Sequence, residues 1–173
     1  CPHRDHRSRG YSDVFSSMAA APSNVLKRLQ KEVAMIASNM PEGCTAGPED
    51  DNMYKWTACV LGPKSSPFAG GKFHLRLTLP KDYPFHPPAI TLTTKTYHPN
   101  VNNEEGSICI GITRDEEWRP TCTMRDVVQA VYDLLVSPNP DHALDAEIAD
   151  VYIKDKKKWE KTAREWTKKH ANK

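Results

Sequence analysis

The sequence predicts one α+β domain, in which a helix is followed by antiparallel strands, a long loop and further helices. Apolar residues recur at helical spacing near the start of the chain, alternate with polar residues in its middle, and return to helical spacing near its end. Short turns separate the alternating segments, which favours an antiparallel meander over parallel strands joined by crossover helices. The chain of 173 residues is long enough to bury a core without disulfides or metal ions.

The first helix is predicted over about 16 residues, with capping-type residues at 22–24 and an end before Pro41. Its apolar stripe consists of Val25, Leu29, Val33 and Ile36. Three β-rich segments are then expected over residues 54–60, 73–79 and 89–94. The turns that separate these segments contain Gly62-Pro63, Gly70-Gly71 and Pro87-Pro88.

Residues 96–122 show no sustained period, and we expect them to form a long ordered loop, a feature that is usually functional in a compact domain. Three helices are predicted after this loop. Their apolar positions are Met124, Val127, Val128, Val131, Leu134 and Leu135, then Leu144, Ile148, Val151 and Tyr152, and finally Trp159, Ala163 and Trp166. The last helix is basic elsewhere, which is typical of an amphipathic helix with a solvated face rather than of a nucleic-acid site.

The composition excludes several classes of protein. A net charge of +2 gives no reason to expect a nucleic-acid partner, and no apolar run approaches the roughly 18 residues that a membrane span needs. The five cysteines form no close pair, which favours reduced thiols in a cytoplasmic and/or nuclear compartment. The seven histidines do not cluster with them, so no zinc site is expected. Nothing resembles a signal peptide.

Residues 1–21 are interpreted as a flexible leader or extension, because their first 17 residues are polar, rich in Arg and His, and without period. Met18 would serve as a natural initiator. The folded domain is expected to span residues 22–173.

The pairing of Cys109 with Asn100 carries the chemistry that the sequence indicates. Cys109 lies nine residues beyond Asn100 and follows a proline-dense approach over residues 80–88. A thiol can hold an acyl group as a thioester, and a carboxamide N–H can donate to the oxyanion that forms when the thioester is attacked. One cysteine and one asparagine are therefore enough for a minimal acyl-transfer site.

From Leu26 to about His170 the chain resembles the ubiquitin-conjugating enzymes. The matching stretches, in order, are LKRLQKE, GP…SPFAGG, YPFHPP, YHPN, GSIC, W-R-P and SPNPD with a helical tail. The resemblance implies the ubiquitin-conjugating fold: an N-terminal helix, a four-stranded antiparallel meander, an active-site loop and C-terminal helices. It makes residues 22–173 a catalytic domain that needs no metal or organic cofactor.

The resemblance also implies roles for individual residues. Cys109 would accept the carboxyl terminus of ubiquitin from an activating enzyme and hold it as a thioester. Asn100 matches an asparagine that either stabilises the oxyanion or orders the loop bearing the cysteine, and both interpretations remain open. His98 matches a histidine that supports this loop, and the structural interpretation is favoured.

Two departures from the family pattern bear on the acceptor of ubiquitin. Gly111 and His142 occupy positions where lysine-directed members commonly have acidic residues, which orient the lysine and lower its pKa. In these two residues the chain resembles the branch of the family that hands ubiquitin to a ligase cysteine, and we favour this acceptor. Transfer to lysine stays open, because His142 could act as a base or Asp141 could move into place. The loop over residues 101–106 is one residue longer than usual, which we expect to shift Cys109 relative to Asn100.

Partner surfaces are implied by the same resemblance. Arg28 and Lys31 would engage the activating enzyme or a ligase from one side of the first helix. Ligase contacts are expected from two loops, with the residues Phe85, Arg119, Pro120 and Thr121. Phe85 is a credible rigid anchor, with a buried Phe as the alternative. Trp118 is expected in the core, and Thr45 matches a site where some relatives bind a second ubiquitin.

The expected partners are ubiquitin, an activating enzyme and a ligase of the HECT or RING type, and the protein is expected to be a monomer. Two alternatives stay open. The chain is either a conjugating enzyme for a ubiquitin-like modifier or a non-catalytic scaffold that binds ubiquitin or a ligase. Cys109 and Asn100 count against a scaffold, because such relatives typically lack the active cysteine.

Overall fold

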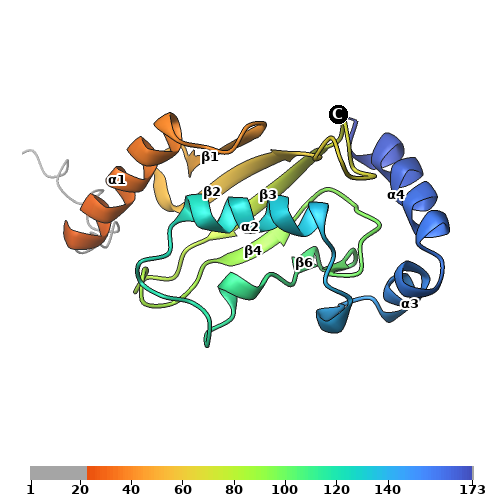
Figure 1. Ribbon diagram of the computed structural model, residues 1–173. Helices are drawn as coiled ribbons and strands as arrows, with labels where there is room; N and C mark the ends of the chain where they lie inside the picture. Colours follow the sequence, from red (N-terminus) through yellow and green to blue (C-terminus); the bar gives the residue numbers. More distant parts are fainter. Residues whose placement is uncertain (1–22, 173) are drawn as a thin grey trace, which may run out of the picture.

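The computed structural model describes residues 23–172 and shows a six-stranded antiparallel sheet covered by helices (Figure 1). The helices are α1 (Ser23–Ser38), α2 (Met124–Val136), α3 (Ala146–Lys154) and α4 (Lys156–His170), with short 3₁₀ helices η1 (Gly111–Thr113) and η2 (Pro140–His142). The strands are β1 (Cys44–Glu49), β2 (Asn52–Leu61), β3 (Lys72–Thr78), β4 (Ala89–Leu92), β5 (Val101–Asn102) and β6 (Ser107–Ile108). The expected leader, Met18 included, lies outside the described residues.

The predicted meander is confirmed over β1 to β4, which pair antiparallel in chain order. Burial alternates strictly along β3, as its sequence pattern predicts. The sequence analysis assigned no individual segment to β1, whose sequence CTAGPE contains a glycine and a proline. Its position at the sheet edge explains the proline: Pro48 stands where the register shifts, and an edge strand tolerates a residue that cannot donate to the ladder.

The expected long loop over residues 96–122 is partly regular, which corrects the prediction. Within it β5 and β6 form a small hairpin, and β6 pairs with β4, so that the sheet order becomes β1-β2-β3-β4-β6-β5. The strands have two residues each, which is too short for an alternating pattern to appear in the sequence. The segment that carries Cys109 is therefore fixed to the sheet rather than suspended from it.

The core lies between the sheet and α2, which crosses the sheet face, while α1 lies at one end of the sheet and α3 and α4 at the other (Figure 1). Buried side chains of α2 face buried side chains of β2 and β3. Leu144, expected in the stripe of the third helix, instead precedes α3 and is exposed, because Asp145 caps that helix by accepting from the Ile148 N–H at 3.0 Å. None of the helices in residues 23–172 is long and apolar enough to cross a membrane.

Candidate active site

Cys109 lies directly after β6 and two residues before η1, and its side chain is half-buried. The backbone N–H of Cys109 donates to the carbonyl of Asn100 at 3.0 Å, one step beyond the Val101–Ile108 pair of the hairpin. The extra residue in the 101–106 loop is therefore taken up within the hairpin turn. The backbones of Cys109 and Asn100 are bonded to each other, and a shift of Cys109 relative to Asn100 stays a prediction.

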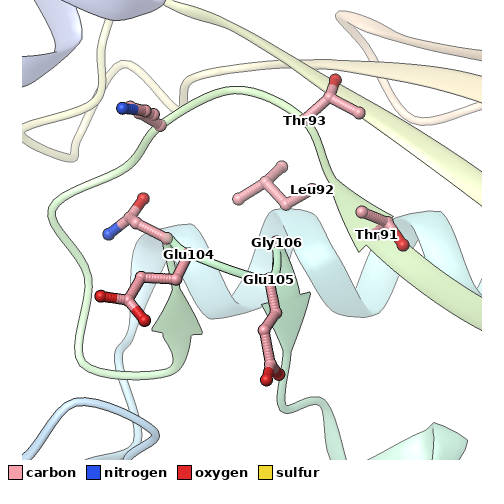
Figure 2. Close-up of a pocket in the computed structure, with 8 residues that line it drawn as sticks. Thr91, Leu92, Thr93, Glu104, Glu105 and Gly106 are labelled. Atoms are coloured by element: carbon pink, nitrogen blue, oxygen red, sulfur yellow. The ribbon is translucent and has the colours of Figure 1, made fainter.

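Gly106 holds this hairpin against β4. Its φ of +73° lies in the left-handed region, and a Cβ atom at this position would stand 2.8 Å from both the Leu92 carbonyl oxygen and Thr91 Cγ2. The Gly106 carbonyl also accepts from the Leu92 N–H at 2.8 Å. Figure 2 shows the surface hollow beside this contact, with Thr91 and Leu92 on β4, Thr93 just beyond its end, and Glu104 and Glu105 extending from the turn. Only glycine fits at this close approach, three residues before Cys109.

Replacement of Gly106 by alanine is expected to lower the free energy of unfolding by about 2–4 kcal/mol, through backbone strain and the clash with β4. The matched control is Gly70→Ala, because Gly70 has nearly the same φ (+80°) but open space around its Cβ position. Gly70→Ala should lower the free energy of unfolding by only about 1 kcal/mol, through backbone strain alone. Urea denaturation of both variants measures the difference, and equal losses would contradict the role of Gly106 in close packing.

Asn100 is completely buried and joins the Cys109 segment to the 139–142 segment. Its Nδ2 donates to the carbonyl oxygens of Asn139 (2.6 Å) and His142 (2.9 Å), and its Oδ1 accepts from the Asn139 N–H at 2.9 Å. Both amide hydrogens are thus used within the fold. To donate to an oxyanion, the side chain would have to release one of these carbonyls. The geometry supports the loop-ordering role among the two alternatives.

His98 is also completely buried and connects Asn100 to α2. Its Nε2 donates to the Leu134 carbonyl at 3.0 Å, and its Nδ1 accepts from the Asn100 N–H at 3.0 Å. This pairing requires the neutral ring with the proton on Nε2, because a backbone N–H cannot accept. Burial lowers the pKa of His98 to about 4, although the bond to the Leu134 carbonyl acts in the opposite direction. These contacts support the structural interpretation of His98.

The lowered pKa of His98 predicts a loss of stability in mild acid. Because the folded-state pKa of about 4 lies below the usual 6.5, the unfolded chain binds the proton more readily between these values. The contribution of His98 to the free energy of unfolding should be complete above about pH 6.5. It should fall by about 3 kcal/mol as the pH falls to about 4. NMR titration of the His98 ring is the direct measurement. A ring that titrates near its usual pKa in the folded protein would contradict this prediction.

His142 is exposed in η2, and Arg114, which the sequence analysis did not select, contacts it. Arg114 Nη1 lies 3.3 Å from His142 Nε2, and His142 Nδ1 lies 3.2 Å from the side-chain amide of Asn139. Because a guanidinium can only donate, Nε2 is the accepting nitrogen. Arg114 also reaches over Gly111, since a Cβ there would stand 3.6 Å from Arg114 Nη2. Gly111 and His142, the two residues that depart from the family pattern, therefore both lie next to the Arg114 guanidinium.

Asp141, beside His142, is exposed and forms no ion pair within residues 23–172. No group of three or more His, Cys, Asp or Glu side chains that could hold a metal occurs in the same part of the chain.

The two expected partner loops are joined beneath the surface by Glu32, a buried residue that the sequence analysis did not select. Glu32 accepts from Arg28 Nε (2.6 Å), the Tyr83 hydroxyl (2.7 Å) and the Met124 N–H (2.8 Å). Burial raises the pKa of Tyr83 and keeps its hydroxyl protonated as a donor. Glu32 stands three residues after Leu29 and four before Ile36, so a carboxylate on the apolar stripe was the signal in the sequence.

Arg28, one of the expected partner residues, is held by contacts within the fold. Its Nη2 donates to the Cys122 carbonyl at 2.7 Å, in addition to the ion pair with Glu32. Burial disfavours its charge, but the contact with Glu32 outweighs burial and raises the pKa of Arg28. Arg28 is thus an internal tether, whereas Lys31 is exposed. The Arg28 side chain is still 28% exposed, and contact of either residue with a partner stays a prediction.

The remaining partner residues are exposed on adjacent loops. Phe85 is 70% exposed, which excludes the buried alternative, and the side chains of Arg119, Pro120 and Thr121 are also exposed. Trp118 is buried, as expected, and its Nε1 donates to the Pro84 carbonyl at 2.7 Å. This bond joins the loop bearing Phe85 to the loop bearing Arg119. Binding of a ligase by these residues stays a prediction.

Comparison with known proteins decides the family. The family model described as ubiquitin-conjugating enzyme matches residues 28–167. The chain belongs to the ubiquitin-conjugating enzyme family. It is also similar to a solved ubiquitin conjugating enzyme domain from Toxoplasma gondii, with 33% identity and a TM-score of 0.78, over 85% of this chain and 99% of that one. A Plasmodium yoelii protein assigned as a ubiquitin conjugating enzyme is 38% identical, with a TM-score of 0.81, over 88% of this chain and 98% of that one.

Membership of the ubiquitin-conjugating enzymes implies transferase activity in ubiquitination and interaction with ubiquitin, activating enzymes and ubiquitin ligases. It also accounts for the fold, since the helix, meander and C-terminal helices are those of the family.

Proposed function

We propose that this protein accepts ubiquitin from an activating enzyme as a thioester on Cys109 and passes it preferentially to the cysteine of a ligase. The observation that carries the proposal is the half-buried Cys109 thiol at the end of a strand, on a segment bonded to Asn100 and through it to residues 139–142. Such a site exposes a nucleophile on a rigid frame. A thiol suits a carrier, because it can attack the activated thioester that a docked partner delivers and hold the acyl group in turn.

The preference for a cysteine acceptor rests on positions 111 and 142, where neither residue has a carboxylate that could assist lysine. Lysine has an ordinary pKa of about 10.4, so that an amine acceptor needs a base or an acidic side chain to deprotonate and orient it. Gly111 has no side chain, and His142 Nε2 is engaged by Arg114. His142 would have to release this contact before it could act as a base. A thiol acceptor loses its proton far more readily and needs less assistance.

The ligase that fits this proposal has its own catalytic cysteine, as HECT-type ligases do. Phe85, Arg119, Pro120 and Thr121 would form its docking surface, because Phe85 is an exposed aromatic residue between two prolines on a loop braced by Trp118. Reduced thiols are required for the reaction. Cys44, Cys59, Cys109 and Cys122, the cysteines in residues 23–172, form no disulfide, which supports a cytoplasmic or nuclear location.

The first experiment is a charging assay with activating enzyme, ubiquitin and ATP, read on a gel without reductant. A product heavier by one ubiquitin, lost on reduction and absent in Cys109→Ala, is the expected result. Cys109→Ser should give a product that resists reduction, because an oxygen ester replaces the thioester. If a ubiquitin-like modifier is charged and ubiquitin is not, the modifier in the proposal is wrong. A protein that no activating enzyme charges would be a scaffold.

The charged protein is then exposed separately to free cysteine and free lysine. Rapid loss of ubiquitin to cysteine with slow loss to lysine is the expected outcome. Comparable rates at equal concentration would overturn the acceptor preference while leaving the carrier function in place.

A further inference from the structure

Arg114 lies beside the candidate active site and forms no ion pair with a carboxylate of residues 23–172. Its side chain is half-buried, its Nη1 contacts the His142 ring, and its Nε is buried without a hydrogen-bond partner in the described part of the chain. None of the ion pairs found in residues 23–172 includes it. Desolvating a guanidinium without compensating its charge is costly, so a charge retained in this position calls for an explanation.

The guanidinium lies beside the segment that follows Cys109. Arg114 Nη2 stands 3.6 Å from the Cβ position of Gly111, and Gly111 follows Cys109 by two residues. Because two residues of extended chain span about 7 Å, the guanidinium lies within about 12 Å of the Cys109 Cα atom. An aspartate at position 111 or 142 would neutralise Arg114. Glycine and histidine supply no carboxylate to neutralise it.

Thiol and amine acceptors differ in the charge that they carry when they attack the thioester near Arg114. With a thiol acceptor, the thiolate attacks the thioester carbonyl, a new C–S bond replaces the old one, and Cys109 leaves as a thiolate. Cys109 then takes up the proton that the acceptor released to water. With an amine acceptor, the neutral amine attacks, a C–N bond replaces the C–S bond, and the amine proton passes through water to the Cys109 thiolate.

The transition state of thiol attack therefore carries a full negative charge, whereas that of amine attack is neutral overall, with positive charge developing on nitrogen. A fixed cation stabilises the first more than the second, because only the first has a net charge to attract. We infer that Arg114 is a specificity-determining residue that favours thiol over amine acceptors through its uncompensated charge. This inference rests on the proposed carrier function of Cys109 and names a residue that selects its acceptor.

The test compares the discharge of the charged protein to ethanolamine and to 2-mercaptoethanol at one pH. These probes are alike except that one carries an amine and the other a thiol. Arg114→Gln should raise the ratio of amine to thiol discharge about fivefold, as expected for loss of a unit charge within about 12 Å of the Cys109 Cα atom. Arg114→Lys keeps the charge and should keep the ratio. Arg164→Gln, the same change of charge on α4, should also leave it unaltered.

Salt gives an independent readout on the unaltered protein. At about 1 M salt the screening length is about 3 Å, so that the ratio in the wild type should move toward that of Arg114→Gln. If Arg114→Gln does not fold, the salt dependence of the wild-type ratio tests the role of the Arg114 charge. Failure of every protein to form a thioester would refute the proposed function itself. Normal charging with an unchanged ratio in Arg114→Gln, or equal changes in Arg114→Gln and Arg114→Lys, would overturn the charge-based role of Arg114.

Discussion

Replacement of Glu32 by alanine is expected to lower the free energy of unfolding by about 3–5 kcal/mol, which places it among the most damaging single changes in the protein. Three donors from three segments meet at this buried carboxylate: Arg28 on α1, Tyr83 in the proline-rich loop, and the first N–H of α2 at Met124. Alanine would leave a half-buried guanidinium, a buried hydroxyl and a helix-terminal N–H without their acceptor.

Two comparisons separate this loss from a general effect of removing a charge. Glu165→Ala, which removes an exposed carboxylate from α4, should change stability by less than about 0.5 kcal/mol. Tyr83→Phe removes only one of the three hydrogen bonds and should cost about 1–2 kcal/mol. Urea denaturation of the three variants measures their free energies of unfolding and so ranks the three losses of stability. A Glu32→Ala variant as stable as Glu165→Ala would show that the network does not hold the loops together.

Replacement of Asn100 by alanine is expected to lower the free energy of unfolding by about 2–4 kcal/mol and the rate of ubiquitin discharge by about 10²-fold. The stability loss follows from the three hydrogen bonds to the 139–142 segment, whose carbonyls and N–H would be left unpaired. A residue whose sole role is to donate to an oxyanion would lower discharge without any loss of stability. The size of the stability change therefore distinguishes the two interpretations of Asn100.

Hydrogen exchange locates the effect. In Asn100→Ala the amide of Asn139 should exchange faster, because it loses its acceptor, whereas Asn103→Ala should leave this amide protected. Asn103 is a matched control, since its side chain also makes two backbone hydrogen bonds, both to Thr96. Unchanged protection at Asn139 in the Asn100 variant would contradict the loop-ordering role.

Much of the fold could be predicted from the sequence, because the helices and the longer strands repeat their apolar positions over many residues. The 16-residue α1 and the alternating β3 are examples. The edge strand β1 and the two-residue strands β5 and β6 could not be assigned in this way. Their conformation is imposed by pairing with neighbouring strands, and they are too short or too irregular for a local pattern to show.

For the candidate site, too, the sequence could predict what lies in local motifs but not the contacts between distant segments. Cys109, Asn100 and His98 could be selected because they lie in ordered motifs within 12 residues, but their bonds to Leu134, Asn139 and His142 could not, since those partners lie 36 to 42 residues away. Arg114 and Glu32 were missed for a related reason. A charged residue on a helix or in a loop is usually solvated, and only the folded chain shows which ones are enclosed.

By itself the sequence determined which segments become helices and strands, and it determined the thiol and the carboxamide that the chemistry needs, because periodicity and residue type are local properties. The tertiary structure decided where charge and hydrogen-bonding capacity are directed. It turned Arg28 inward to Glu32, committed both amide hydrogens of Asn100 to the 139–142 segment, and set the Arg114 guanidinium against Gly111 and His142. The physical reason is that desolvation and pairing depend on which groups meet in space, and residues distant in sequence supply those neighbours.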